Sequence, residues 1–273
     1  MKNDSDPILG MIGCGNMGEA LIKGILASRL VAKDNLVGYD IRPERRGYIK
    51  EKFGIRLASS NPELIATSDI VILAVKPQQM DELLIEISRA FDPVHLIISI
   101  VAGVTTHHIE SFIKAEVAVI RVMPNTPALI GAGISAISVG SHIKARDKEV
   151  TRSIFQAVGE VVEVEEQLMD VVTAISGSGP AYFFYLIESL IKVGIKHGLP
   201  EEVARKLANQ TALGSARMVL ETGEDPRALR EKVTSKGGTT EAAFGVFDRV
   251  KLAEIYSEAV DAAIKRSQEL SGG

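Results

Sequence analysis

The sequence predicts an α/β domain on a parallel sheet over residues 1–165, followed by an all-helical domain over residues 166–273. Three observations predict this division. Up to about residue 163, short β-branched runs alternate with segments of helical period, the pattern of βα units that feed a parallel sheet. After about residue 167 the strand signal ends, and glycines and prolines separate helical stretches. The length of 273 residues is also close to the size at which chains divide into domains.

The predicted strands are mostly continuous apolar runs, which is typical of strands covered by helices on both faces. They span residues 8–13, 35–39, 55–58, 69–75, 95–101, 117–122, 133–139 and 160–164. The helices predicted in the first domain span residues 17–28, 43–53, 78–91 and 144–158. Pro43 and Pro62 fit this scheme, because proline is tolerated in the first turn of a helix.

The second domain contains a helical segment, residues 181–196, that is apolar almost all the way round. Such a helix is normally buried, yet a domain of about 100 residues has little interior in which to bury it. A further helical segment, residues 203–218, has small residues beside its apolar positions, which allow another helix to approach closely. We interpret these helices as a subunit interface, with folding onto the first domain as the alternative.

Composition excludes several classes of protein. The chain is 46% hydrophobic and 24% charged, and its 31 Lys and Arg against 35 Asp and Glu leave no basic excess for nucleic acid. We therefore expect a small-molecule partner. The longest apolar stretch, residues 96–104, is about half of the ~20 residues that cross a bilayer, so no membrane span is expected. A single cysteine and a polar, acidic start at residues 1–7 predict a cytoplasmic protein.

A glycine motif predicts dinucleotide binding. Gly13, Gly15 and Gly18 form G-x-G-x-x-G directly after the first strand and at the start of a helix. The first glycine permits a tight turn, the second lets backbone approach a pyrophosphate, and the third allows close packing of helix and strand. Asp40 ends the second predicted strand, 22 positions after Gly18, where a carboxylate can hydrogen-bond the ribose hydroxyls.

The choice between NADH and NADPH stays open at this point. Asp40 favours NADH because its charge would repel a 2′-phosphate, but Arg42, Arg45 and Arg46 follow it and could bind that phosphate. Arg45 and Arg46 also suit the exposed face of a helix. Comparable catalytic efficiency with both cofactors would contradict a strong preference set by Asp40.

Three later segments follow predicted strands, at the sheet edge where the rest of a dinucleotide should lie. They are residues 74–78, with Lys76 as their one charge, residues 99–103, whose small side chains leave space for ribose and nicotinamide, and residues 123–127. Two prolines flank Asn125 and would hold its amide near the nicotinamide ring. An exposed lysine at a strand end is the alternative interpretation of Lys76.

A segment rich in hydroxyl groups marks the second domain. Thr234, Ser235, Thr239 and Thr240 surround Gly237 and Gly238, just before a segment of helical composition. Hydroxyls and free amides at the start of a helix form a site for a carboxylate. A simple helix cap is the alternative, but one cap needs only one hydroxyl.

These motifs resemble those of the pyrroline-5-carboxylate reductases over essentially the whole chain. The resemblance rests on residues 13–18, 74–78, 123–127, 176–182 and 233–240. It implies an enzyme that reduces 1-pyrroline-5-carboxylate to proline, the last step of proline synthesis, with NADPH or NADH. It also implies a Rossmann domain and a helical dimerisation domain, hence a homodimer that can be built into a larger ring such as a decamer.

The resemblance, with the motif analysis, assigns roles to individual residues. Ser235, Gly238 and Thr239 would meet the substrate carboxylate, and Thr240 would lie near the ring nitrogen as the catalytic residue, orienting the imine and relaying a proton. The predicted cofactor contacts are Ile12, Gly13, Cys14, Gly15, Asn16, Met17, Gly18, Asp40, Asn61, Ala74, Val75, Lys76, Pro77, Val101, Ala102, Gly103 and Asn125. Lys236 stands where the family usually has proline, which questions the rigidity of this loop. Its cation could attract the acidic substrate, and an unchanged KM in Lys236→Pro would remove that hypothesis.

Other chemistry has little support in the sequence. The five histidines are scattered, and no cluster has metal-ligand spacing, so no metal site is expected. One alternative is another reductase of similar architecture, such as an imine reductase or a β-hydroxyacid dehydrogenase with Lys192 or Lys196 as its catalytic lysine. The other is a dinucleotide-binding regulator without catalysis. Neither alternative explains the threonine-rich loop.

Overall fold

The computed structural model describes residues 7–271. The chain divides into two compact units, and each is described by itself. Unit 1 comprises Met1–Ser178 with Ala263–Gly273, and unit 2 comprises Gly179–Ala262. The predicted domain boundary at 165/166 therefore falls inside unit 1, and it stays a prediction.

Unit 1 is built on one eight-stranded sheet in the order β3-β2-β1-β4-β5-β6-β7-β8. All eight predicted strands are present. Their bounds are β1 Leu9–Ile12, β2 Leu36–Tyr39, β3 Arg56–Leu57, β4 Ile70–Leu73, β5 Leu96–Ser99, β6 Ala118–Met123, β7 Gly133–Val139 and β8 Gly159–Glu163. One pair departs from the expected parallel sheet, because β7 runs antiparallel to β6. Only η3 (Thr126–Ile130), a single short 3-10 segment, connects these two strands, whereas a parallel crossover needs a dozen residues or more.

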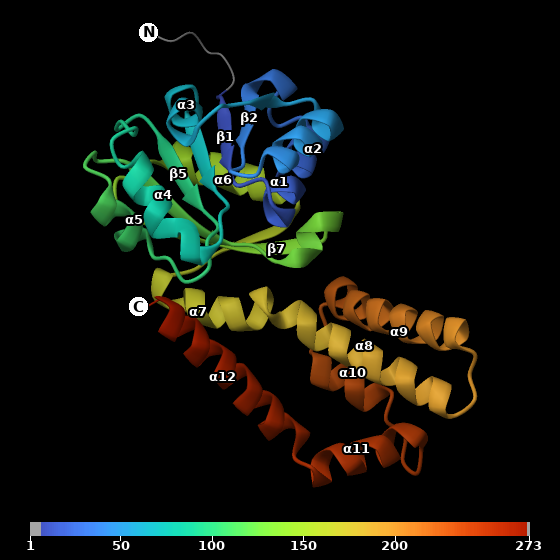
Figure 1. Ribbon diagram of the computed structural model, residues 1–273. Helices are drawn as coiled ribbons and strands as arrows, with labels where there is room; N and C mark the ends of the chain where they lie inside the picture. Colours follow the sequence, from blue (N-terminus) through green and yellow to red (C-terminus); the bar gives the residue numbers. More distant parts are fainter. Residues whose placement is uncertain (1–6, 272–273) are drawn as a thin grey trace. The chain divides into compact units, whose positions relative to one another are not determined.

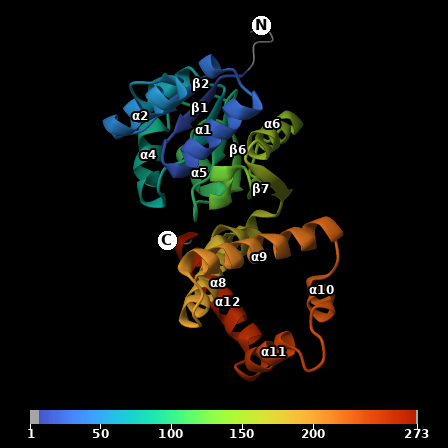
Figure 2. The same cartoon turned by 90° about the vertical axis from the view of Figure 1, so that its right-hand side faces the viewer.

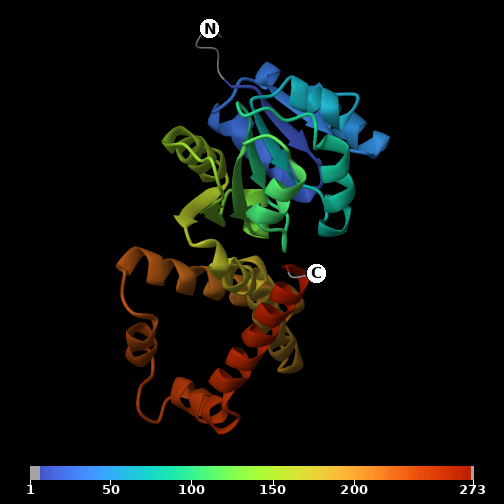
Figure 3. The same cartoon turned by 90° about the vertical axis from the view of Figure 1, so that its left-hand side faces the viewer.

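Helices cover both faces of the sheet, as the apolar strands require (Figures 1 and 3). The first six helices are α1 Asn16–Ser28, α2 Pro43–Phe53, α3 Asn61–Ala66, α4 Met80–Ile87, α5 Thr106–Phe112 and α6 Ala145–Gln156. One buried cluster joins one face of the sheet to α1 and α6, and a second joins the opposite face to α3, α4 and α5. The prediction covered α1, α2, α4 and α6, and it extended α4 four residues beyond its observed end.

The strand order reverses direction between β1 and β4, with β2 and β3 on one side and β5 on the other. Ile12 pairs with Tyr39 of β2 and with Leu73 of β4, so the three segments that follow these strands emerge at the same edge. In open parallel sheets, ligands bind in the crevice at such a reversal. The glycine loop, Asp40 and Ala74 all lie at this edge.

Residues 166–178, which follow the last strand, also belong to unit 1. These contain α7 (Met169–Val172) and a π-helix over Thr173–Gly177, and the side chains of Met169 and Ala174 are fully buried. The end of α12 (Leu252–Ser271) also belongs here, because Ser267 donates a hydrogen bond to Asp170 at 2.6 Å. These contacts place 166–178 with the sheet rather than with the helices that follow.

Unit 2 contains α8 (Gly179–Lys196), α9 (Glu201–Thr222), α10 (Pro226–Lys232), α11 (Thr239–Arg249) and the first part of α12. Helices α8 and α9 pack together, whereas α10 and α11 stand apart from that pair (Figure 2). Gly194 of α8 lies directly against Ala204 of α9, so small residues set this close approach. Within residues 7–271, no helix is long and apolar enough to span a membrane.

Candidate functional site

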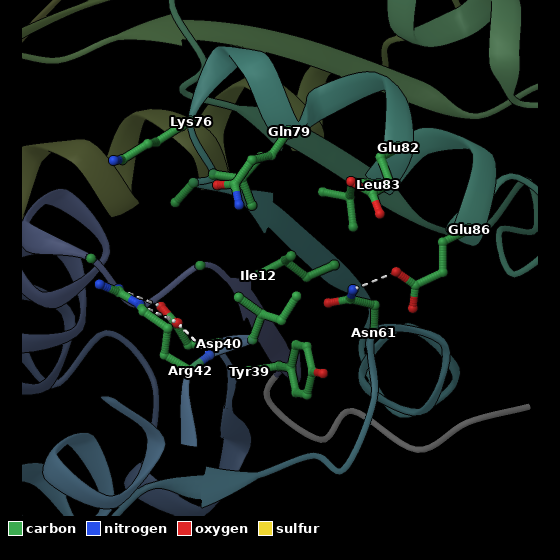
Figure 4. A pocket seen from close by; sticks show the side chains of 15 residues that line it. Ile12, Tyr39, Asp40, Arg42, Asn61, Lys76, Gln79, Glu82, Leu83 and Glu86 are labelled. Atoms are coloured by element: carbon green, nitrogen blue, oxygen red, sulfur yellow. Dashed lines mark hydrogen bonds and ion pairs between the residues drawn. The ribbon is translucent and has the colours of Figure 1, made fainter. Parts of the chain in front are cut away.

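A cavity of about 360 Å³ lies at the strand-order reversal of unit 1 (Figure 4). Its walls come from the ends of β1, β2 and β4 with the loops that follow them, and from α3 and α4. The lining residues are Ile12, Gly13, Gly15, Tyr39, Asp40, Ile41, Arg42, Asn61, Ala74, Val75, Lys76, Gln79, Glu82, Leu83 and Glu86. Eight of the predicted cofactor residues are among them, so the structure brings the core of the predicted site together.

The glycine loop has the tight packing and the open position expected of its three glycines. Gly13 has a φ of +90°, and a Cβ there would lie 2.6 Å from the carbonyl oxygen of Ala74. A Cβ on Gly18 would clash with the Gly13 carbonyl oxygen, whereas one on Gly15 would meet no atom within 4 Å. Space at Gly15 and close packing at Gly13 and Gly18 match the roles expected of the three glycines.

The start of α1 supplies free donors for an anion. The amides of Gly13 and Cys14 are already used, since they donate to the Tyr39 carbonyl oxygen and to Asp40. Within the described part of the chain, the amides from Gly15 to Gly18 have no acceptor, and no side chain caps this helix. These amides and the helix dipole fit a dinucleotide pyrophosphate, so the residues present suit the predicted cofactor.

Asp40 is buried, with 5% of its surface exposed, and both carboxylate oxygens are engaged. Arg42 contacts it through Nε at 2.9 Å, Nη2 at 3.1 Å and its backbone amide at 3.1 Å. The Cys14 amide adds a fourth hydrogen bond at 3.0 Å. Burial raises the pKa of this carboxyl, but these hydrogen bonds outweigh burial and hold the pKa below its usual value. Asp40 therefore joins the glycine loop to the end of β2.

Arg45 and Arg46 turn toward the glycine loop and β2 instead of lying on an exposed helix face. Arg45 donates to the Cys14 carbonyl oxygen and pairs with Glu19 of α1, and it also reaches the Gly15 carbonyl oxygen at 3.3 Å. Arg46 donates to the Asp40 carbonyl oxygen at 2.6 Å. Of the three arginines, Arg42 alone lines the cavity.

The opposite wall of the cavity is formed by α3 and α4. Asn61 is buried, and its Nδ2 donates a hydrogen bond to Glu86 at 2.9 Å, while its buried Oδ1 has no partner among residues 7–271 (Figure 4). An unpaired buried acceptor beside a cavity fits a hydroxyl or amino donor from a ligand. Gln79, Glu82, Leu83 and Glu86 were missed in the sequence, although their helical spacing could have indicated a common face.

Two further residues of this edge have well-defined environments. Lys76 is exposed on the cavity wall, and the described residues include no carboxylate paired with it, so it remains available to a phosphate. Burial, followed by the charge of Asp40, raises the pKa of the Cys14 thiol to about 12. Cys14 therefore stays a thiol at neutral pH and contributes packing and its backbone to the loop.

Several predicted cofactor residues do not line this cavity. Val101 is packed in the core, and Gly103 faces the carbonyl of Leu270 in α12, so these small residues serve packing rather than open space. Asn125 accepts from the Ile134 amide at 3.0 Å and donates to the Ser176 carbonyl oxygen at 3.2 Å. Its carboxamide thus holds the π-helix against β7. A contact of these residues with the cofactor stays a prediction, as it does for Cys14, Asn16, Met17, Gly18, Pro77 and Ala102.

In unit 2, the threonine-rich segment forms the start of α11. The Thr234 hydroxyl donates to the Arg230 carbonyl oxygen at 2.7 Å, and the Gly238 amide donates to the Ser235 carbonyl oxygen at 2.9 Å. The remaining hydroxyls, of Ser235, Thr239 and Thr240, have no partner among the described residues. The first amides of α11 also lack acceptors in that part of the chain. The geometry favours an anion site built from Ser235, Thr239 and Thr240, while Gly238 contributes its turn rather than its amide.

Comparison with known proteins relates both regions to one family. Residues 166–270 match the family model "Pyrroline-5-carboxylate reductase dimerisation", and residues 8–103 match "NADP oxidoreductase coenzyme F420-dependent". The chain is 42% identical to a pyrroline-5-carboxylate reductase of Synechocystis, over 96% of this chain and 97% of that protein. The chain belongs to the pyrroline-5-carboxylate reductase family.

Solved structures of this reductase family agree with that assignment. One from Coxiella burnetii has a TM-score of 0.89 at 35% identity and covers 98% of this chain and 99% of its own. Another, from Plasmodium falciparum with NADP bound, has a TM-score of 0.89 at 34% identity and covers 99% of each chain. The predicted resemblance, the Rossmann-like α/β domain and the helical dimerisation domain are confirmed.

The structure gives little support to the alternative enzyme classes. Lys192, a candidate catalytic lysine of a β-hydroxyacid dehydrogenase, is exposed and forms an ion pair with Glu188. Its hydrogen bond with Glu188 raises the pKa of Lys192, so this amine is already protonated at neutral pH and is not available as a base. In residues 7–271 no group of three or more His, Cys, Asp or Glu side chains could hold a metal ion.

Proposed function

We propose that this protein reduces 1-pyrroline-5-carboxylate to proline by hydride transfer from NADPH or NADH to the C=N bond. The observation that carries the proposal is the start of α11, where three hydroxyls and the first amides lack partners among the described residues. Together they suit a small substrate that carries a carboxylate beside an imine nitrogen. A dinucleotide-binding regulator would have no need for this second site.

Unit 1 binds the cofactor in this proposal. The amides from Gly15 to Gly18 hold the pyrophosphate, and Asn61 and Lys76 contact the cofactor from the other walls of the cavity. When bound, the reduced nicotinamide supplies the hydride. The contribution of the protein is to fix two reactants in one orientation, and well-oriented reactants gain about 7–11 kcal/mol relative to free encounter.

Residues 235–240 bind the substrate. The Ser235 hydroxyl and the amides of Thr239 and Thr240 hold the carboxylate, and the helix dipole adds to this attraction. The Thr240 hydroxyl hydrogen-bonds the ring nitrogen. Because a threonine hydroxyl is a poor acid, Thr240 orients the nitrogen and relays a proton from water, and the imine reacts in its protonated form.

The working form of the protein is proposed to be a homodimer, or a larger ring such as a decamer, in the cytoplasm. Residues 166–270 match a dimerisation family, and the apolar side chains of α8 are exposed within the single chain. The one cysteine is a buried free thiol, as expected in a reducing compartment.

An assay of oxidation of NADPH and of NADH upon addition of 1-pyrroline-5-carboxylate, with detection of proline, tests the function directly. Turnover with either cofactor is the expected result, and absence of turnover at high enzyme concentration would refute the proposal. Thr240→Val should lower kcat by about tenfold or more, because the nitrogen loses its hydrogen-bond partner. Thr222→Val, at the exposed end of α9, is the matched control.

A further inference from the structure

The loop before α11 contains a tight turn over Ser235, Lys236, Gly237 and Gly238. The Gly238 amide donates to the Ser235 carbonyl oxygen at 2.9 Å, which closes the turn. Gly237 has a φ of +73°, and Lys236 is not among the residues with positive φ. This combination defines a type II turn with Lys236 at its second position and Gly237 at its third. The second position of such a turn favours proline, and the third favours glycine.

Glu241 connects this turn to the helix that follows. It lies in the first turn of α11, and its Oε2 accepts a hydrogen bond from the Gly237 amide at 2.7 Å. The closing hydrogen bond of the turn leaves that amide unused, so the carboxylate supplies its partner. On the other side of the loop, the Thr234 hydroxyl is bonded to α10. The turn is therefore held to both flanking helices by side chains.

The residues of the turn are flexible, so the hydrogen bond between Gly237 and Glu241 is needed to restrain it. Two adjacent glycines have the greatest backbone freedom of any residues, and a lysine at the second position leaves φ unrestrained where a proline would fix it. Ordering such residues costs more conformational entropy than ordering residues with a restricted backbone. The hydrogen bond from the Gly237 amide to Glu241 restrains one of these two flexible glycines directly.

We propose that Glu241 is a positioning residue, which holds the Ser235–Gly238 turn in the conformation that presents the Ser235 hydroxyl and the first amides of α11 to the substrate. The inference rests on the proposed function of this loop. It assigns to Glu241 the restraint that a proline at position 236 would provide. A carboxylate so close to an anion site has one competing effect, repulsion of the acidic substrate, which would act on KM in the opposite direction.

Four variants separate restraint from repulsion: Glu241→Ala, Glu241→Gln, Lys236→Pro and the double variant Lys236→Pro/Glu241→Ala. Asp248→Ala removes an equal charge two turns further along α11 and serves as the control. Amide hydrogen exchange over residues 235–240 reports the order of the turn in each purified protein. KM for 1-pyrroline-5-carboxylate and kcat report its effect on the substrate.

If Glu241 restrains the turn, Glu241→Ala should speed exchange at Gly237 and Gly238 and raise KM about fivefold, the value of one hydrogen bond, with kcat changed less than about twofold. Glu241→Gln should have a smaller effect, because its amide oxygen still accepts. The double variant should recover slow exchange at Gly238 and a KM within about threefold of the wild type, since proline fixes φ at the second position.

Three results would overturn the proposal: a lower KM in Glu241→Ala, unchanged exchange in that variant, or no recovery in the double variant. Failure of the proposed function would look different. In that case the wild type would not reduce 1-pyrroline-5-carboxylate at all, while the exchange measurements would still decide whether Glu241 holds the turn.

Discussion

At the scale of single residues, Asp40 shows how a predicted ligand contact can be occupied by the protein itself. Its carboxylate receives four hydrogen bonds, from the Cys14 amide and from Arg42. Two carboxylate oxygens offer about four acceptor positions, and these four bonds use them within the protein, so a ribose hydroxyl would have to replace one of them. The Arg42 guanidinium is paired with the Asp40 carboxylate and largely neutralises its negative charge. Asp40 should therefore repel a 2′-phosphate only weakly.

We therefore expect Asp40→Asn to weaken the binding of NADH and of NADPH equally. The glycine loop loses its anchor, so KM for NADH and for NADPH should each rise roughly 5- to 20-fold, the equivalent of about 1–2 kcal/mol. The ratio of the two values should change less than about twofold. Asp34→Asn, at an exposed position before β2, controls for the loss of one charge. A selective loss of NADH binding would instead show that Asp40 hydrogen-bonds the ribose.

The lowered pKa of Asp40 also predicts how stability depends on pH. A carboxyl with a lowered pKa in the folded state stabilises the protein fully above its pKa in the unfolded state, about pH 4, and loses this contribution as pH falls through the folded pKa. The difference in unfolding free energy between wild type and Asp40→Asn should be constant from pH 7 to about pH 5 and narrow below pH 4. Urea unfolding at these pH values measures it. A difference that widens in acid would contradict this account.

The same residues show the limit of sequence analysis at this scale. The spacing of Gly13, Gly18 and Asp40 was sufficient to predict that the glycine loop and Asp40 lie together at one edge of the sheet, because the motif fixes where strand, turn and helix meet. The spacing did not indicate that Arg42 pairs with Asp40 or that Arg45 reaches back to the glycine loop. Such contacts depend on rotamers and on the packing of α1 against α2, which no local pattern encodes.

At the scale of elements, the start of α1 separates folding from binding. Gly18→Ala should destabilise the protein by about 2 kcal/mol or more, since its Cβ would clash with the Gly13 carbonyl oxygen. Gly15→Ala meets open space and should leave stability nearly unchanged, while it raises KM for the cofactor about tenfold or more by filling the position of the pyrophosphate.

Gly47→Ala on α2 is the control, because it also meets no atom within 4 Å and is far from the loop in sequence. It should be neutral or stabilise by up to about 1 kcal/mol. Thermal unfolding and cofactor KM measure the three variants. A large loss of stability in Gly15→Ala, or normal cofactor affinity in that variant, would show that the space at Gly15 has another purpose.

Elements with strong local signals were predicted well, and those set by tertiary contacts were not. The apolar runs identified every strand, because strands buried on both faces need them. The antiparallel direction of β7 was missed, since a run of apolar residues is the same in either direction. The π-helix over Thr173–Gly177 was also missed, because its distortion is stabilised by Asn125 from a distant loop.

At the scale of the whole molecule, the second unit explains why the family carries a dimerisation domain. Helix α8 exposes large apolar side chains along most of its length, and Phe183, Phe184 and Tyr185 are each more than 60% exposed. Many large apolar side chains exposed along one helix are typical of a protein–protein interface. The sequence predicted this from an apolar helix in a domain too small to bury it, and the match of residues 166–270 to a dimerisation family confirms self-association.

The dimer should therefore depend on the exposed face of α8. Phe184 is 62% exposed in the single chain, and burying a phenylalanine contributes about 1.5–3 kcal/mol. In a twofold interface each substitution occurs twice, so Phe184→Asp should weaken association at least about 100-fold, and burial of two unpaired carboxylates would weaken it further. Sedimentation velocity at micromolar protein should show monomers. The variant should keep the helical content of the wild type, because the substitution lies outside the core of the single chain.

Val94→Asp is the control: it places the same charge on a 79% exposed apolar residue of unit 1 and should leave the dimer intact. If Phe184→Asp stayed dimeric while folded, the interface would have to lie on another face, for which the exposed side chains of α9, Leu207, Leu213 and Met218, are the next candidates.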